Sequence, residues 1–238
     1  MKKVINMIKN VAAAAEMTFA RGSEEGFKEN YESLRKLVSR LNASHVGLSK
    51  DQIVASAVHR SFRMAPTATT IHVHENQNFS IGVFILGQEK KIPLHDHPNM
   101  FGMIKCIHGK LQIKSYTPLS TEGTYTVPTK IIEKIPRDLF HTLTPCKLSD
   151  ERLVMSSDEI VCSLDPANGN IHEIQALDGP AAFIDILSPP YDGHERDCTY
   201  YTRIDESGNE NEITWLMPTQ PPQEYWTRPA EYRGPPIE

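Results

Sequence analysis

The spacing of hydrophobic residues predicts helices in the first part of the chain. In residues 3–20 and 26–42 apolar side chains recur every three to four positions, as they do on one face of an amphipathic helix. A third, shorter helix is expected to start at Ser49, because Gln52 stands three positions on as a capping-box partner. The expected buried stripe of this helix consists of Ile53, Val54, Ala57 and Val58.

Beyond about Thr69 the hydrophobic period changes to that of β-strands. Apolar and polar side chains alternate in residues 79–85 and again in residues 110–114. A later strand is expected over residues 171–176, with His172, Ile174 and Ala176 on one face. Many short strands separated by Gly, Pro and Asn turns predict a mainly β barrel or sandwich behind the N-terminal helices.

The remaining segments are less regular. Residues 116–165 hold several prolines and short apolar runs, and we expect loops and two or three strands there. The tail from Pro218 is rich in proline and aromatic residues and should wrap the body as extended chain. The expected organisation is a helical segment, residues 1–65, packed on a β domain, residues 66–238.

Composition and charge exclude some classes of function. The chain has 238 residues, of which 39% are apolar and 23% charged, as is usual for a globular protein. A formal net charge of −5 argues against nucleic-acid binding, which normally needs a basic surface. No stretch is long and apolar enough to predict a membrane span, so we expect neither a nucleic acid nor a membrane as partner.

The cysteines and the N-terminus bear on cellular location. Cys106, Cys146, Cys162 and Cys198 show no CxxC pairing, and in a chain of this size they are expected to be reduced thiols. The apolar run near the N-terminus is interrupted by charged and polar residues, unlike a secretory signal. We expect a protein of the cytoplasm, with the nucleus as a further location. The alternative is a mitochondrial presequence.

The segment around His95 and His97 carries the clearest chemical signal. Residues two apart on a strand point to the same face, so the two imidazoles form half of a transition-metal site. His172, on its own predicted strand, is the best candidate for a third ligand; the alternative is a histidine that lines the β core without metal. His72 and His74 have the same spacing, and we interpret them as strand-surface or rim residues; the alternative is that one of them lines the pocket.

The residues around this pair resemble the first metal motif of the cupins. His95-x-His97 is followed by glycines at positions 102 and 109, as in that motif. Cupins carry a glutamate after three or four intervening residues beyond the second histidine, and those positions are held here by Phe101 and Gly102. A three-histidine cupin that lacks this glutamate looks like the thiol dioxygenases.

Further segments narrow the resemblance. The chain closely resembles the family of cysteamine (2-aminoethanethiol) dioxygenase and the plant cysteine oxidases in residues 92–98, 179–187, 189–192 and 196–201. This resemblance implies a mainly β fold, a cupin double-stranded β-helix or jelly-roll barrel, with N-terminal α-helices. It also implies Fe(II) bound by His95, His97 and His172.

The implied reaction uses O2 to oxidise a thiol to a sulfinic acid. The implied substrates are a small aminothiol, cysteamine, and proteins with an N-terminal cysteine. In the second case the product marks a protein for the Arg branch of N-degron turnover, so that the enzyme senses oxygen. Nothing in the sequence indicates an oligomer, and we expect a monomer.

Two further residues are candidates for catalysis. Asp185 lies on an apolar strand face, where an unpaired carboxylate is costly. Its expected partner is the substrate ammonium, a metal ligand or a tyrosine, and the alternatives are a buried salt bridge or a turn-anchoring role. Tyr191 follows two prolines, and its hydroxyl is expected on the oxygen or substrate side of the iron; the alternative is packing at the barrel mouth.

Cys198 and Tyr200 form the last candidate pair. They stand two apart and would share one side of a strand. The resemblance implies a thioether cross-link between them, whereas the alternative is a buried cysteine beside a core tyrosine. Rival functions are a non-redox metal cupin, such as an isomerase, and a non-catalytic ligand-binding cupin.

Overall fold

The N-terminal part of the chain folds into helices, as the periodicity predicts. The computed structural model describes residues 6–20, 26–57, 65–120, 125–204 and 213–237. The Asn6 side chain begins the first helix by accepting a hydrogen bond of 3.1 Å from the Lys9 backbone N–H. The helices are α1 (Met7–Phe19), α2 (Phe27–Ser39), α3 (Lys50–Ala57) and the short α4 (Thr129–Ile132), with 3-10 turns at Ala43–Val46 and Arg137–Thr142.

Helix α3 confirms the predicted cap and corrects the predicted stripe. The Gln52 backbone N–H donates to the Ser49 hydroxyl at 3.2 Å, and the Ser49 N–H donates to the Gln52 side chain at 2.8 Å. Ile53 is fully buried, but Val54 is 37% exposed, so its predicted burial is wrong. The next residue along a helix points about 100° away, which carries Val54 off the narrow contact face. Val58 lies outside the described residues.

The strands form an antiparallel barrel. The sheet order is β10-β1-β2-β7-β3-β8-β9-β5-β4-β6, and an additional pairing of β7 with β4 closes a ring through β3, β8, β9 and β5. The strands are β1 (Ala68–Glu75), β2 (Ser80–Leu86), β3 (Lys91–Asp96), β4 (Phe101–Pro118), β5 (Thr144–Met155), β6 (Cys162–Leu164), β7 (Ile171–Ser188), β8 (Tyr200–Arg203), β9 (Thr214–Thr219) and β10 (Thr227–Ala230).

The long strands β4 and β7 run together through both layers of the barrel. They bend side by side, β4 at Gly109 and β7 at Asp178 and Gly179, which all have positive φ. A side chain at position 109 would place its Cβ 2.5 Å from the Pro180 carbonyl oxygen, so only glycine allows this close approach. The bends let one strand pair with β2 in one layer and with β3 in the other.

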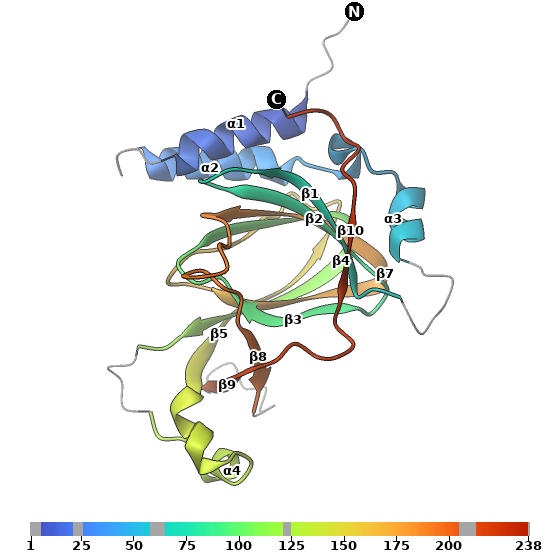
Figure 1. Cartoon of the computed structure of the whole chain (residues 1–238). Helices are drawn as coiled ribbons and strands as arrows, with labels where there is room; N and C mark the ends of the chain where they lie inside the picture. Colours follow the sequence, from blue (N-terminus) through green and yellow to red (C-terminus); the bar gives the residue numbers. More distant parts are fainter. Residues whose placement is uncertain (1–5, 21–25, 58–64, 121–124, 205–212, 238) are drawn as a thin grey trace, which may run out of the picture.

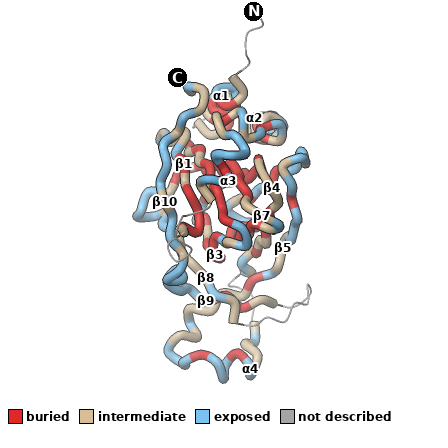
Figure 2. The backbone as a smooth tube through the Cα atoms, turned by 90° about the vertical axis from the view of Figure 1, so that its right-hand side faces the viewer, coloured by how far each residue is buried: buried red, intermediate tan, exposed pale blue. Residues whose placement is uncertain are grey.

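The layer of β1, β2, β7 and β4 is buried on both faces. Helices α1 and α2 lie across its outer face (Figure 1), where Val83, Ile184 and Ile186 join Ile8 and Leu34 in one apolar core. The alternate residues of the same strands point into the barrel and form a second core. Figure 2 shows the buried backbone concentrated in these strands. The structure thus confirms a mainly β, cupin-like barrel with N-terminal helices; the boundary between residues 1–65 and 66–238 stays a prediction.

The later segments follow their predictions in part. Within residues 116–165, β5 and β6 are the expected strands, but the apolar run at Lys130–Ile132 belongs to helix α4. The tail beyond Pro218 is largely extended and adds β10, which pairs in parallel with β1. It then reaches α1 (Figure 1), where the Asn6 side chain donates to the Pro236 carbonyl at 2.7 Å. Within the described ranges, the helices are all too short or too polar to cross a membrane.

Candidate metal centre

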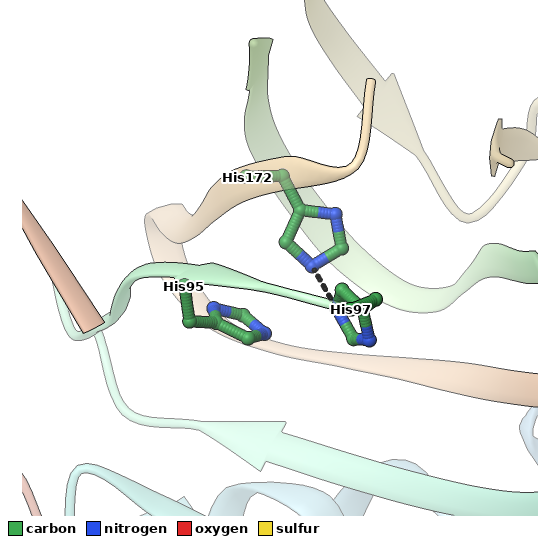
Figure 3. A group of neighbouring side chains, drawn as sticks. All are labelled: His95, His97 and His172. Atoms are coloured by element: carbon green, nitrogen blue, oxygen red, sulfur yellow. Dashed lines mark hydrogen bonds between the residues drawn. The ribbon is translucent and has the colours of Figure 1, made fainter. Parts of the chain in front are cut away.

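Three histidines meet inside the barrel. His95 lies on β3 and His172 on β7, and the two residues stand directly opposite each other in the antiparallel pairing. Directly opposite residues project their side chains to the same face. His97 follows the end of β3, and its ring turns back toward the other two (Figure 3). The ligand atoms of the three side chains all lie within 4.8 Å of one another, and all three residues are buried.

The spacing of these rings suits a metal ion. Metal–imidazole bonds of about 2.1 Å that meet at right angles place two nitrogens roughly 3 Å apart. The Nε2 atoms of His97 and His172 are 3.1 Å apart and hydrogen-bonded to each other (Figure 3). The His95 ring centroid lies 4.9 Å from that of His97 and 4.7 Å from that of His172. The three rings therefore fit one face of a metal's coordination sphere.

Hydrogen bonds fix the tautomer of two of the rings. His95 Nδ1 donates to the Pro93 carbonyl at 2.8 Å, which leaves the Nε2 lone pair free for a metal. The Tyr191 hydroxyl donates to the Asp96 carbonyl at 2.6 Å and lies 2.8 Å from His97 Nδ1. Because that hydroxyl already donates to a carbonyl, it accepts from His97 Nδ1–H, and the Nε2 of His97 also keeps its lone pair.

The backbone of His97 is held by Asn170. The His97 N–H donates to Asn170 Oδ1 at 3.2 Å, and Asn170 Nδ2 donates to the His97 carbonyl at 2.6 Å. Asn170 stands two residues before His172. The residue that holds the His97 backbone therefore comes directly before the strand that carries another candidate ligand. The sequence did not single out Asn170. An asparagine two residues before a candidate ligand is the sequence signal that could have identified Asn170.

Burial keeps the three histidines neutral. It lowers the pKa of His95 to about 4, and it holds the pKa values of His97 and His172 well below their usual range, with mutual repulsion between the rings adding to the effect. Neutral imidazoles offer lone pairs to a cation. The nearby Asp96 carboxylate is occupied elsewhere, since it accepts from the Thr199 N–H at 2.8 Å and the Tyr201 hydroxyl at 2.9 Å.

The positions where a cupin glutamate would stand have other roles. Phe101 packs against Phe27 of α2 at 5.2 Å between ring centroids. Phe19 of α1 and Tyr31 of α2 also contact its ring. A Cβ on Gly102 would lie 2.9 Å from Leu164 Cγ, so a larger side chain there would require Leu164 to shift. Among the described residues, the group that could hold a metal contains histidines alone.

The histidines line a cavity of about 360 Å³ that also contains the other predicted site residues. His72 lines this cavity, whereas His74 packs against Phe79 at 5.3 Å between ring centroids. The two residues therefore differ: His72 is exposed and lines the cavity, which fits the interpretation as a rim residue, whereas His74 is half-buried. Asp185, Tyr191, Cys198 and Tyr200 all line the cavity, together with Tyr225 from the tail, which the sequence did not single out.

Asp185 is an unusual member of this lining. Its side chain is buried, and Oδ1 has no hydrogen-bond partner within the part of the chain that the structure describes. Burial raises the pKa of the Asp185 carboxyl to about 7. A buried carboxylate without a partner is costly, and its position beside the metal-site candidates suits a cationic ligand.

Tyr191, Cys198 and Tyr200 lie close together on the same wall. The Tyr191 hydroxyl contacts the outer nitrogen of His97, on the far side of that ring from Nε2. Burial raises the pKa of the Cys198 thiol to about 11, although hydrogen bonds with the hydroxyls of Tyr191 and Tyr200 oppose this. Burial likewise raises the pKa of Tyr200. At neutral pH the sulfur and both hydroxyls thus carry their protons.

The chain is similar to proteins of one known family. The PCO_ADO family matches residues 37–237 of the chain. The chain is 32% identical to 2-aminoethanethiol dioxygenase of Mus musculus, over 98% of this chain and 96% of the relative. It is 32% identical to the Homo sapiens 2-aminoethanethiol dioxygenase, over 90% and 83%. Plant cysteine oxidase 1 of Arabidopsis thaliana is 30% identical, over 74% of this chain and 60% of the relative.

Similarity to solved structures is weaker. A Klebsiella pneumoniae protein with a double-stranded β-helix domain is 14% identical, with a TM-score of 0.36 over 62% of this chain and 87% of that chain. A Silicibacter pomeroyi sugar phosphate isomerase of the cupin superfamily is 14% identical, with a TM-score of 0.30 over 48% and 52%. Similarities at this level support no conclusion about the site.

Proposed function

This chain belongs to the PCO_ADO family, and on that premise we propose that it is an Fe(II)-dependent thiol dioxygenase. The reaction is R–SH + O2 → R–SO2H, in which both oxygen atoms end on the sulfur of a sulfinic acid. The observation that carries the proposal is the buried group of three neutral histidines in a cavity that also contains Asp185, whose Oδ1 has no hydrogen-bond partner among the described residues.

The three histidines are the proposed metal ligands. His95, His97 and His172 would hold the iron through their Nε2 atoms, on one side of the ion. Bound ferrous iron supplies the electron transfer that lets dioxygen react with a thiol. Three neutral ligands leave the charge of a divalent cation uncompensated, and a substrate thiolate is therefore favoured at the open side.

Asp185 is the proposed partner of the substrate amino group. Asp185 lines the same cavity as the histidines, and its Oδ1 has no partner in the described part of the chain. An ammonium group would pair with this oxygen and stabilise the ionised carboxylate. Because the amine and the thiol of an aminothiol are linked by two carbons, this pairing would orient the sulfur toward the histidines.

Tyr191 is a proposed positioning residue. Its hydroxyl links His97 Nδ1 to the Asp96 carbonyl, and such bonds set the orientation and basicity of a metal-bound imidazole. We also propose a thioether between the Cys198 sulfur and the Tyr200 ring. Forming it removes the thiol hydrogen and one ring hydrogen, and dioxygen accepts the two electrons. Intact mass spectrometry of the iron-loaded protein in air would detect the loss of two hydrogens.

The proposed substrates are cysteamine and the N-terminal cysteine of proteins. In the second case the product would feed the Arg branch of N-degron turnover and couple protein lifetime to oxygen supply. We propose that the enzyme works as a monomer in the cytoplasm, with the nucleus as a further place of action. Four free cysteines in the described structure are compatible with such a reducing compartment.

The test is oxygen consumption by protein loaded anaerobically with Fe(II). Cysteamine, free cysteine and a peptide that begins with cysteine are supplied in turn, and mass spectrometry measures the product. The expected result is oxygen uptake with at least one substrate and two added oxygen atoms on its sulfur. Absence of uptake with all three substrates at full iron occupancy would refute the proposed function.

A further inference from the structure

The inner wall of the cavity is built of cross-strand rows. In the register of β1, β2 and β7, His72 stands opposite Gly82, and Gly82 stands opposite Asp185. Directly opposite residues project to the same face of a sheet. His72, Gly82 and Asp185 all line the cavity that holds the three histidines, so this row faces the metal-site candidates.

The neighbouring rows are filled, whereas this row has a gap. On one side Thr70, Phe84 and Phe183 stand in register, and the two phenylalanine rings stack at 5.1 Å between centroids. On the other side Glu75 stands opposite Ser80, which stands opposite Leu187. All six of these residues line the cavity as well. Glycine at position 82 therefore leaves a slot between an imidazole and a carboxylate.

Local geometry directs His72 into the cavity. The register of β1 with β2 shifts between His72 and His74, so the two residues do not share a face as they would on a regular strand. His72 is exposed to the solvent of the cavity mouth, while Asp185 is buried deeper in the row. The slot thus has an accessible end and a buried end.

We propose that His72 and Asp185 together bind the amino group of the thiol substrate, and that Gly82 makes the room for it. This inference rests on the proposed function, because it assigns one part of that substrate to a place. Strands lie about 4.8 Å apart, which separates the two outer Cα atoms by roughly 10 Å. The two residues flank the glycine in register and both line the cavity, so an ammonium between them would have two acceptors within reach.

The two partners differ in what they contribute. Asp185 offers a negative charge from a buried position, whose Oδ1 has no partner within the described residues. The exposed His72 imidazole offers a second acceptor through a ring nitrogen that carries no hydrogen. An ammonium has three donors, and it therefore binds better between two acceptors than against one. A thiol without an amine gains nothing from either residue.

The test measures binding separately from turnover. Calorimetry under anaerobic conditions gives the Kd of the iron-loaded protein for cysteamine and for ethanethiol, which has the same carbon chain and no amine. We expect the natural chain to prefer cysteamine. His72→Ala should raise the cysteamine Kd about tenfold, as expected for one lost hydrogen bond to a charged group, and leave the ethanethiol Kd unchanged.

The chain offers matched variants. His74→Ala removes a histidine from the same strand outside the cavity and should bind like the natural chain, and His72→Gln should restore much of the preference. Gly82→Val should weaken cysteamine binding by filling the slot. A Cβ at position 82 meets Phe84 Cε2 at 3.6 Å and the Ile71 oxygen at 3.9 Å, which are ordinary contacts. Thermal unfolding checks that the Gly82→Val variant folds.

The possible results decide between the two proposals. The inference is overturned if the natural chain shows no preference for cysteamine, if His72→Ala and Gly82→Val leave its Kd unchanged, or if they weaken both thiols equally. If the preference behaves as expected but cysteamine, cysteine and the peptide cause no oxygen uptake, the proposed function fails and the amine site stands.

Discussion

Replacing Tyr191 with phenylalanine should weaken iron binding without unfolding the protein. The variant keeps the ring and removes only the hydroxyl that joins His97 Nδ1 to the Asp96 carbonyl at 2.8 and 2.6 Å. His97 Nδ1–H is then left without its partner inside the barrel, where His97 is only 1% exposed. The ring can turn or change tautomer, and either change moves the Nε2 lone pair away from the metal.

The expected loss of Fe(II) affinity can be worked out in two ways. Losing the partner of a metal-bound histidine costs about 10- to 100-fold in metal affinity, which corresponds to about 1.4–2.7 kcal/mol. A buried donor left unsatisfied costs about 1–3 kcal/mol. Because the two ranges agree, we expect the Fe(II) Kd of Tyr191→Phe to rise between about 10- and 100-fold.

The assay is anaerobic competition for Fe(II) between the protein and a coloured chelator. Tyr116→Phe is the control, because the Tyr116 hydroxyl accepts from Arg203 Nη1 at 2.8 Å and lies outside the histidine network. Thermal unfolding of the metal-free proteins checks that each variant folds. A Tyr191→Phe protein that folds normally and binds Fe(II) as tightly as the control would refute the role of this hydroxyl.

Three further changes test the site. His172→Ala should abolish both iron retention and thiol oxidation, measured by metal analysis and oxygen uptake; retained activity would rule out its role as a ligand. Burial raises the pKa of Asp185 to about 7, so the folded chain keeps a proton that the unfolded chain releases above about pH 4. The free energy of unfolding should therefore fall as the pH rises from about 4 to 7, and this fall should be absent in Asp185→Asn. Urea unfolding of the two metal-free proteins measures it, and identical pH profiles would contradict the prediction. Gly102→Glu should lower stability by about 1–3 kcal/mol, because its Cβ would meet Leu164 at 2.9 Å; a thermal melt equal to that of the natural chain would disprove the steric argument.

The two His-x-His pairs show what spacing can and cannot predict. The sequence correctly singled out the pair at residues 95 and 97, although His97 reaches the group from beyond the end of its strand. The pair at residues 72 and 74 has the same spacing, but a register shift separates its faces and sends only His72 into the cavity. A β-bulge depends on the pairing with the neighbouring strand, which the spacing does not contain.

Long-range pairing explains the other successes and gaps. His172 could be proposed from its strand pattern, but its position opposite His95 depends on the pairing of β3 with β7. In residues 181–187 the alternation is hidden, because helices cover one face of the sheet while the other lines the barrel. Tyr191 was placed near the metal, but its contact with the outer nitrogen of His97 depends on a loop conformation that the residue types do not specify.

The aromatic cluster around Phe101 joins the N-terminal helices to the metal site. Phe101 stands four residues after His97, and it packs against Phe19, Phe27 and Tyr31. Helix docking and metal binding thus share one short segment, and thermodynamic linkage requires that any coupling between them be reciprocal. An ion that orders His97 would slow amide hydrogen exchange in α1 and α2, and loosening these helices would cost metal affinity by the same factor. The packing of the N-terminal helices would in this way contribute to the free energy of metal binding.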